Sequence, residues 1–211
     1  MKKRIAILGS TGSIGKSTLN IIKENKFLFD IVLLTANNNY IKLAQQAKAF
    51  NAKNVLIKNI KLHKKLKKIL KNEKTKVFSG NIPLSNIIKK KLDYTMSSIV
   101  GLAGLQPTID AMKISKKIAI ANKETIICGW QILSELKKKY KTEIIPVDSE
   151  HFSIMELTKN IQDDEVEEII ITASGGPFLN KPNHKLNEVN IEEAVKHPNW
   201  SMGKKISIDS A

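Results

Sequence analysis

The chain has 211 residues, 42% of them hydrophobic, and its 35 Lys and Arg exceed its 20 Asp and Glu to give a formal net charge of +15. This length suits one large domain, or one complete domain and part of a second. Cys128 is the only cysteine, which excludes an intrachain disulfide and a cysteine metal cluster. Its isoleucine neighbours predict a buried thiol.

The positive charge lies in the first part of the chain. Residues 1–147 hold 29 Lys and Arg against 8 Asp and Glu, whereas residues 148–211 hold 6 against 12. A basic segment can attract nucleic acid or nucleotide phosphates. However, few aromatic residues interleave with the lysines. One helical stripe of segment 61–70 is apolar, which predicts a solvated lysine face opposite it; the stripe consists of Leu62, Leu66, Ile69 and Leu70. We therefore expect no nucleic-acid partner and place a domain boundary at residue 147.

The apolar runs are short. Ile5–Leu8 is ended by Gly9, so it is too short for the core of a signal peptide. No run approaches the roughly 20 apolar residues that a membrane-spanning helix needs. We therefore expect a cytoplasmic protein with no membrane partner.

The first element is a strand at residues 4–8, followed by a turn with glycines at positions 9, 12 and 15 and a helix from about residue 14 to 26. Glycines permit a tight turn and a close approach of the backbone to a ligand. The N-terminus of the following helix offers unpaired N–H groups and a positive dipole to an anion. This stretch predicts a site for a phosphate-bearing ligand.

Two known loops compete for these residues. Gly15, Lys16 and Ser17 match the second half of a P-loop, but Ser10 occupies the position of its first glycine. The dinucleotide-binding fingerprint spaces its glycines by two and three residues, whereas here both spacings are three. This stretch alone therefore leaves three interpretations open: a P-loop, a dinucleotide-binding loop and a glycine-rich turn that binds no ligand.

A second buried strand at residues 31–35 ends in Asn37, Asn38 and Asn39, before a helix at residues 40–50. A site for NAD would place an Asp or Glu here to bind the ribose hydroxyls. No acidic residue is present, which favours a 2′-phosphate held by the Asn amides or by Lys42. The alternative is a polar turn that caps the helix.

Strands and helices continue to alternate up to residue 147. We expect strands at residues 55–57, 77–78, 94–100, 118–121 and 142–147, and helices at residues 61–70, 84–91, 107–115 and 124–140. This order predicts an α/β fold with a doubly wound parallel sheet of the Rossmann type. Ligands bind such folds at the carboxyl ends of the strands.

Asp148, Ser149, Glu150 and His151 follow the last of these strands. Two carboxylates in such a place suit a hard cation, because Mg²⁺ and Mn²⁺ prefer oxygen ligands. An acidic pair with a serine is also typical of a helix N-terminus. Both interpretations stay open from the spacing alone.

The last part of the chain contains one further apolar run, Val166–Thr172, which predicts a strand. The turn that follows it could present Ser174 and backbone N–H groups to an anion. Residues 179–204 are polar and contain one short helix at residues 191–196. They resemble a mobile lid that would close over a small substrate with His197, Trp200 and Met202.

Six motifs stand along the chain, at residues 9–17, 121–124, 146–151, 173–178, 197–203 and 206–211. Taken together and in this order, they resemble a known enzyme family, 1-deoxy-D-xylulose 5-phosphate reductoisomerase, and the resemblance covers the whole chain. The resemblance implies a domain at residues 1–147 that binds NADPH, and the start of a catalytic domain at residues 148–211. It also implies conversion of 1-deoxy-D-xylulose 5-phosphate to 2-C-methyl-D-erythritol 4-phosphate for isoprenoid synthesis, with Mg²⁺ or Mn²⁺, in a homodimer.

The resemblance assigns roles to individual residues. The expected NADPH contacts are Thr11, Gly12, Ser13, Ile14, Asn37, Asn38, Asn39, Asn122, Lys123, Glu124 and Gly203. The expected metal ligands are Asp148 and Glu150, and these two act in catalysis with Lys123 and His197. The expected substrate contacts are Ser149, Glu150, Ser174, His197, Trp200, Met202, Gly203 and Ser210.

The chain departs from the family pattern in two ways. Asn38 stands where a basic residue is common, and the sequence ends at Ala211, before the family's Asn and Lys phosphate ligands and its third metal carboxylate. We therefore expect a chain that binds cofactor and holds metal weakly. A P-loop-like nucleotide phosphotransferase and a basic nucleic-acid-binding module are the alternatives from other functional classes.

Overall fold

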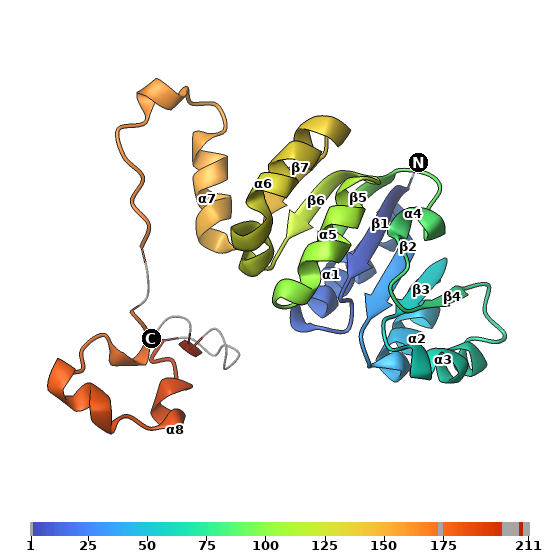
Figure 1. Cartoon of the computed structure of the whole chain (residues 1–211), viewed down its shortest axis with the longest axis horizontal. Helices are drawn as coiled ribbons and strands as arrows, with labels where there is room; N and C mark the ends of the chain where they lie inside the picture. Colours follow the sequence, from blue (N-terminus) through green and yellow to red (C-terminus); the bar gives the residue numbers. More distant parts are fainter. Residues whose placement is uncertain (1, 173–174, 200–206, 209–211) are drawn as a thin grey trace. The chain divides into compact units, whose positions relative to one another are not determined.

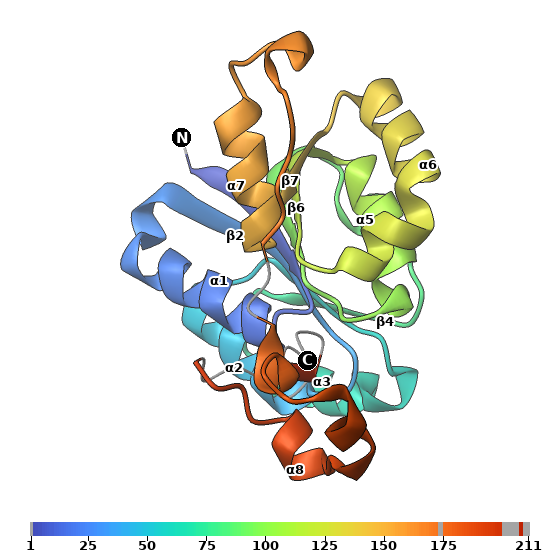
Figure 2. The ribbon, with the colours of Figure 1, turned by 90° about the vertical axis from the view of Figure 1, so that its left-hand side faces the viewer.

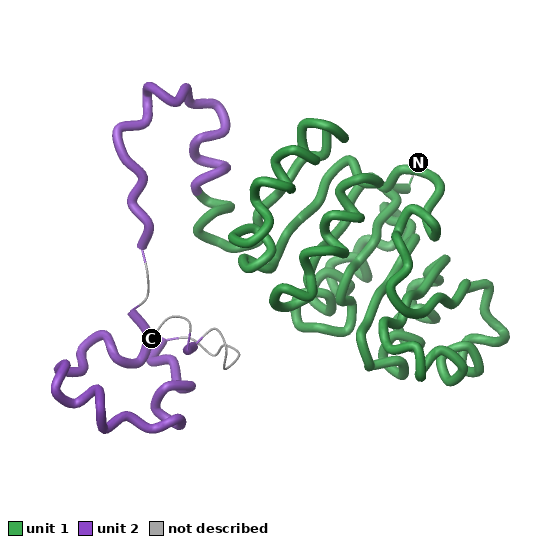
Figure 3. The backbone as a smooth tube through the Cα atoms, viewed as in Figure 1, with its two compact units in different colours: residues 1–153 green, residues 154–211 purple. Residues whose placement is uncertain are grey.

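The computed structural model describes residues 2–172, 175–199 and 207–208. The chain forms two compact units, residues 1–153 and residues 154–211 (Figure 3).

Unit 1 is built on a seven-stranded parallel sheet with the strand order β4-β3-β2-β1-β5-β6-β7 (Figure 1). The strands are β1 (Lys3–Leu8), β2 (Phe29–Ala36), β3 (Asn54–Ile57), β4 (Lys76–Ser79), β5 (Leu92–Ser97), β6 (Ser115–Ile120) and β7 (Glu143–Pro146). β1 lies at the centre, where Ile5 is paired with Ile31 of β2 and with Tyr94 of β5. The predicted α/β fold with a doubly wound parallel sheet is confirmed.

Helices cover both faces of the sheet, with α1 and α2 on one side and α5 and α6 on the other (Figure 2). The helices of unit 1 include α1 (Ser13–Glu24), α2 (Tyr40–Phe50), α3 (His63–Ile69), α4 (Leu84–Ile87), α5 (Leu105–Met112) and α6 (Lys123–Tyr140). Short 3₁₀ turns η1 (Lys26–Leu28), η2 (Ile60–Leu62) and η3 (Leu102–Gly104) complete the connections.

The core has two layers because the central strands are buried on both faces. Along β1, Ile5 and Ile7 pack with α1 and α2, while Ala6 and Leu8 pack with the helices of the opposite face. Burial on both faces explains why the strands appear in the sequence as continuous apolar runs rather than alternating patterns.

Three expectations about unit 1 are corrected. The helix predicted at residues 84–91 is only one turn, since α4 ends at Ile87. Segment 61–70 buries Leu66 and Leu70, but Ile69 is exposed, so the predicted apolar stripe is narrower than its four residues suggested. Cys128 is exposed rather than buried, because α6 turns Thr125, Gly129 and Leu133 toward the interior.

Beyond residue 147 the structure contains α7 (Ser149–Thr158), which crosses the boundary between the units. Unit 2 then has the turns η4 (Asp163–Glu165), η5 (Gly176–Phe178) and η6 (Asn183–Glu188) and the short helix α8 (Ile191–Ala194). Within the described residues, no helix is long and apolar enough to span a membrane.

The strand predicted at Val166–Thr172 is wrong. This run has no regular structure, and Ile169, Ile170 and Ile171 are 57%, 73% and 66% exposed. A strand needs a neighbour to pair its backbone groups, and no described residue pairs with this run.

Candidate functional site

The direction of strand order reverses at β1, between β2 on one side and β5 on the other. Ligands of doubly wound sheets bind at the carboxyl ends of the strands beside such a switch point. Gly9 follows β1 here with a φ of +80°, and a Cβ at this position would lie 2.9 Å from the carbonyl oxygen of Ser98. The loop after β1 therefore requires glycine both for its conformation and for its contact with the end of β5.

The next turn leads directly into α1. A Cβ on Gly15 would lie 2.5 Å from the carbonyl oxygen of Gly9 and 2.6 Å from the Cα of Ser10, so α1 packs closely against the loop. Gly12 is the N-cap, no side chain caps the helix, and its first turn has no acidic residue. The N–H groups of the first turn, from Ser13 onward, are thus suited to an anion.

The P-loop hypothesis is not supported by this geometry. In a P-loop the Gly-rich backbone cradles phosphates immediately before the helix. Here α1 already begins at Ser13, and the N–H of Lys16 donates to the carbonyl oxygen of Gly12 at 3.0 Å. The Lys16 N–H is therefore committed to the helix.

Two residues that the sequence analysis missed hold the glycine loop in place. Thr35 of β2 accepts the Gly9 N–H on its Oγ1 at 3.0 Å and the Ser10 N–H on its carbonyl oxygen at 2.9 Å. Gln46 of α2 is hydrogen-bonded to Ser10 through both ends of its side-chain amide. The sequence signal for the second of these residues was a polar side chain, Gln46, between the apolar residues Leu43 and Ala47 of the predicted helix.

The Asn-rich loop lies at the carboxyl end of the neighbouring strand, β2. Asn39 caps α2, because its Oδ1 accepts the Lys42 N–H at 3.1 Å, so the capping interpretation is confirmed for this residue. Asn59, after β3, donates from its N–H to the Asn37 carbonyl oxygen at 3.1 Å and from Nδ2 to Asn38 Oδ1 at 2.9 Å. Residues 37–39 remain exposed at the carboxyl end of β2.

Asn122, predicted to contact the cofactor, uses its side chain within the protein. Its Nδ2 donates to the carbonyl oxygens of Ile99 and, at 2.8 Å, Gly101, while its Oδ1 accepts the Thr125 N–H at 2.7 Å and caps α6. These bonds fasten the loop after β5 to the loop after β6. The residues that follow, Lys123 and Glu124, form the first turn of α6.

The predicted metal ligands Asp148 and Glu150 lie at the start of α7. Asp148 Oδ1 accepts from the N–H of His151 at 3.2 Å and contacts His151 Nδ1 at 2.7 Å, so it also acts as a helix cap. Burial raises the pKa of Asp148, but the hydrogen bonds from His151, together with a hydrogen bond with Glu150 and the charge of His151, hold that pKa below its usual value. Glu150 Oε2 accepts from Ser149 Oγ at 2.8 Å.

These two carboxylates offer oxygen donors of the kind that hard cations prefer. No cluster of three or more His, Cys, Asp or Glu able to hold a metal occurs among the residues that the structure describes. The donor chemistry therefore fits Mg²⁺ or Mn²⁺, but Asp148 and Glu150 supply only part of a coordination shell.

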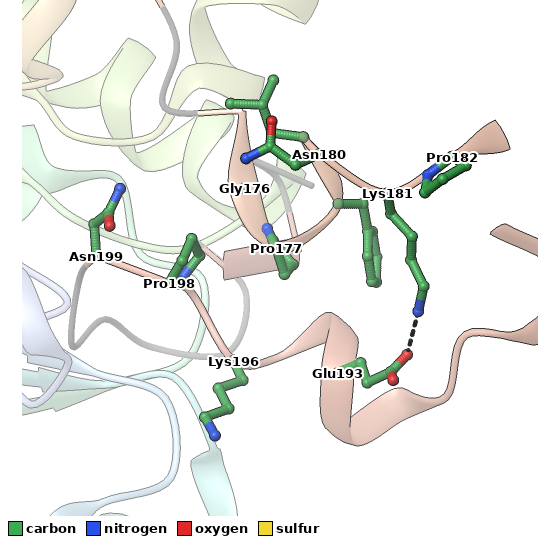
Figure 4. Close-up of a pocket in the computed structure, with 11 residues that line it drawn as sticks. Gly176, Pro177, Asn180, Lys181, Pro182, Glu193, Lys196, Pro198 and Asn199 are labelled. Atoms are coloured by element: carbon green, nitrogen blue, oxygen red, sulfur yellow. Dashed lines mark hydrogen bonds and ion pairs between the residues drawn. The ribbon is translucent and has the colours of Figure 1, made fainter. Parts of the chain in front are cut away.

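In unit 2, His197 is 8% exposed and its Nδ1 accepts the Asn199 N–H at 3.1 Å. Its neighbours Lys196, Pro198 and Asn199 line a hollow of about 580 Å³. Lys181 and Glu193 also line this hollow and form an ion pair of 2.9 Å, which is drawn as a dashed line in Figure 4. Lys181 donates to Glu193 and lowers the pKa of that carboxyl. The hollow is open and lacks every predicted cofactor and metal residue, so we do not assign the site to it.

Five expected site residues lie outside the described part of the chain. They are Ser174, Trp200, Met202, Gly203 and Ser210.

Comparison with known proteins identifies the family of the chain. Residues 5–129 match the family model for 1-deoxy-D-xylulose 5-phosphate reductoisomerase, and residues 144–211 match the model for the C-terminal domain of the same enzyme. The chain belongs to the 1-deoxy-D-xylulose 5-phosphate reductoisomerase family. The resemblance seen in the six sequence motifs is thereby confirmed.

Individual reductoisomerases match along the whole chain. The enzyme of Pelagibacter ubique is 53% identical over 211 residues, which are 99% of this chain and 54% of that protein. The enzyme of Caldanaerobacter subterraneus is 46% identical over 209 residues, again 54% of its length. The chain thus spans about half the length of the curated reductoisomerases it matches.

Solved reductoisomerase structures have the same fold. The Zymomonas mobilis enzyme in complex with NADPH is 38% identical, with a TM-score of 0.90 over 100% of this chain and 54% of its own. A reductoisomerase in complex with NADPH, fosmidomycin and magnesium is 34% identical, with a TM-score of 0.86 over 99% of this chain and 54% of its own.

Proposed function

We propose that this chain is the cofactor-binding and metal-binding portion of an NADPH-dependent and Mg²⁺- or Mn²⁺-dependent 1-deoxy-D-xylulose 5-phosphate reductoisomerase. The observation that carries the proposal is the uncapped N-terminus of α1 behind a glycine loop at the switch point of the sheet. The relatives that bind NADPH and magnesium support it.

The proposed cofactor contacts are brought to the carboxyl ends of three strands. Thr11, Gly12, Ser13 and Ile14 follow β1, the Asn-rich loop follows β2, and Asn122, Lys123 and Glu124 follow β6. The first turn of α1 would bind the pyrophosphate through its N–H groups. Asn37, Asn38 and Asn39 would contact the ribose that carries the 2′-phosphate, and Gly203 would add a contact from the lid. Bound NADPH supplies the hydride for the reduction.

The proposed metal ligands are Asp148 and Glu150, and the bound cation supplies a Lewis acid and a template for the substrate oxygens. Ser149 would bind the sugar beside these carboxylates, while Ser174 and Ser210 would bind its phosphate. Lys123 and His197 would approach the reacting carbon skeleton. Trp200, Met202 and Gly203 would cover it and keep water from the site.

The substrate in this proposal is the small phosphorylated sugar 1-deoxy-D-xylulose 5-phosphate, and the product serves isoprenoid synthesis. We further propose that the complete enzyme is a cytoplasmic homodimer without a nucleic-acid or membrane partner. The domain division that we propose has every proposed cofactor residue except Gly203 in 1–147 and the partial catalytic domain in 148–211.

A titration of the chain with NADPH, monitored by the fluorescence of NADPH, tests the proposal. We expect saturable binding of NADPH that ATP does not compete away at equal concentration. No binding of NADPH, or tighter binding of ATP, would overturn the proposal and restore the phosphotransferase alternative.

The metal assignment has its own test. Mn²⁺ titration with paramagnetic relaxation should show weak binding to the chain, and Asp148→Asn or Glu150→Gln should weaken it further, since each removes one of two charged ligands. NADPH affinity should stay unchanged in both variants. Equal Mn²⁺ affinity in wild type and both variants would show that these carboxylates do not bind the metal.

A further inference from the structure

Gln46 is a polar residue on the buried face of α2. It is 6% exposed and lies between the fully buried Leu43 and Ala47, where the helix packs on the sheet. An amide in an apolar layer is costly unless both of its ends are hydrogen-bonded.

Both ends of the Gln46 amide bind one residue of the glycine loop. The Oε1 atom accepts from Ser10 Oγ at 2.7 Å, and Nε2 donates to the Ser10 carbonyl oxygen at 2.8 Å. Ser10 itself is fully buried. The two hydrogen bonds fix both the side chain and the carbonyl of Ser10, and therefore the peptide plane that leads to Thr11.

The opposite side of the loop is fastened to β2. The Gly9 N–H donates to Thr35 Oγ1 at 3.0 Å, and the Ser10 N–H donates to the Thr35 carbonyl oxygen at 2.9 Å. Ser10 is thus clamped between a strand and a helix, with its polar groups used inside the protein. The residues that follow it, Thr11 to Ser13, are more exposed.

We propose that Gln46 is a positioning residue for cofactor binding. By holding Ser10 inward, it orients the backbone from Thr11 to Ser13 toward the dinucleotide pyrophosphate without touching the cofactor. This inference rests on the proposed function and adds a residue that acts through the loop. Because NADPH and NADH share the pyrophosphate, the inference requires the same loss of affinity for both.

The binding test compares Gln46→Met with Gln45→Met, its exposed neighbour on α2. Methionine keeps the length of the side chain and removes both hydrogen bonds. At a temperature where circular dichroism shows all proteins folded, Gln46→Met should weaken the binding of NADPH and of NADH equally, by about tenfold, because the Ser10 carbonyl oxygen loses the amide that orients it. Gln45→Met should bind as wild type does.

A residue that only stabilised the fold would lower the melting temperature of Gln46→Met but leave the affinity of the folded protein unchanged. That result would overturn the inference while the proposed function stands. A larger loss of affinity for NADPH than for NADH would also overturn the inference, since such a difference would place the effect at the 2′-phosphate. Ser10→Ala removes one of the two hydrogen bonds and provides the same comparison if Gln46→Met does not fold.

Amide hydrogen exchange of the ligand-free chain tests the positioning separately from any cofactor. In Gln46→Met the amides of Ser10 and Gly12 should exchange faster than in Gln45→Met, while amides in the centre of β6 stay unchanged. Unchanged exchange at the loop would overturn the inference even if NADPH binds. If wild type binds no NADPH, the proposed function fails, and the exchange result still decides whether Gln46 holds the loop.

Discussion

Asp93, the second residue of β5, joins the edge of β1 to β6. Its Oδ2 accepts the Arg4 N–H at 2.9 Å, and its Oδ1 pairs with Lys116 Nζ at 2.7 Å. The hydrogen bond from Lys116, followed by that from Arg4, lowers the pKa of Asp93 from its usual value near 3.8 despite partial burial. The folded protein therefore favours the carboxylate.

Asp93→Asn should accordingly destabilise the chain at neutral pH and not in acid. Because the folded pKa is depressed, the stabilisation is present above the unfolded pKa and is lost as the pH falls through the folded value. We expect a loss of about 0.5 kcal/mol at pH 7, since Lys116 is solvent-exposed. Urea unfolding at pH 7 and in acid measures it, with Glu135→Gln on α6 as the control. A difference from wild type that persists in strong acid would contradict the charge argument.

Lys42 is the residue proposed to replace the missing basic side chain at Asn38. It is exposed on the first turn of α2 and lines a hollow of about 280 Å³ with Lys16 of α1. Lys42→Met should weaken NADPH by about fivefold and leave NADH unchanged, because only NADPH carries the charged 2′-phosphate. Lys48→Met, on the same helix, is the control. Equal effects on both cofactors would remove Lys42 from the 2′-phosphate site.

At the scale of residues, the sequence indicated local features and missed distant ones. Gly12 and Asn39 could be placed because a helix start and its cap are encoded within a few neighbouring residues. Gln46 and Thr35 lie 36 and 25 positions from Ser10, so only the folded sheet brings them to the loop. Metal ligation by Asp148 stays a prediction, and its role as a helix cap is visible in the structure.

At the scale of elements, the close contact between α1 and the glycine loop predicts whether alanine at position 15 stabilises or destabilises the chain. Alanine normally stabilises a helix interior by up to about 1 kcal/mol over glycine. Gly15→Ala should instead destabilise the chain by about 2 kcal/mol, because its Cβ would collide with the backbone of Gly9 and Ser10. It should also weaken NADPH binding. Chemical denaturation, with Ser17→Ala as the control, measures whether Gly15→Ala raises or lowers the free energy of unfolding.

The parallel sheet could be predicted because the central strands β1 and β2 contain continuous apolar runs and because strands and helices alternate along unit 1. The same signal failed at Val166–Thr172, where the apolar run has no pairing partner among the described residues. It also overextended α4, because Leu84 and Ile88 are both buried but Ile88 follows the helix with an extended backbone. At residues 84–91, hydrophobicity therefore predicted burial better than it predicted the end of the helix.

At the scale of the whole molecule, most proposed cofactor contacts belong to unit 1, and the residues of the proposed lid belong to unit 2. The connection from α7 to the rest of unit 2 contains Glu165, Glu167 and Glu168, all exposed. The glycine loop, the Asn-rich loop and the start of α6 are each held by hydrogen bonds within unit 1. Binding of the cofactor should therefore depend little on an intact connection.

Limited digestion with a glutamate-specific protease provides the test. Cleavage should occur first at the exposed glutamates 165, 167 and 168, because Glu165 ends the short turn η4 and the residues after it have no regular structure, so that the segment opens to a protease at little cost. The purified N-terminal fragment should bind NADPH within about threefold of the intact chain, since only Gly203 of the proposed contacts is removed. Mass spectrometry locates the cut, and the same titration as for the intact chain gives the affinity. A loss of more than about thirtyfold, in a fragment that stays folded by circular dichroism, would show that unit 2 supplies a large part of the binding free energy.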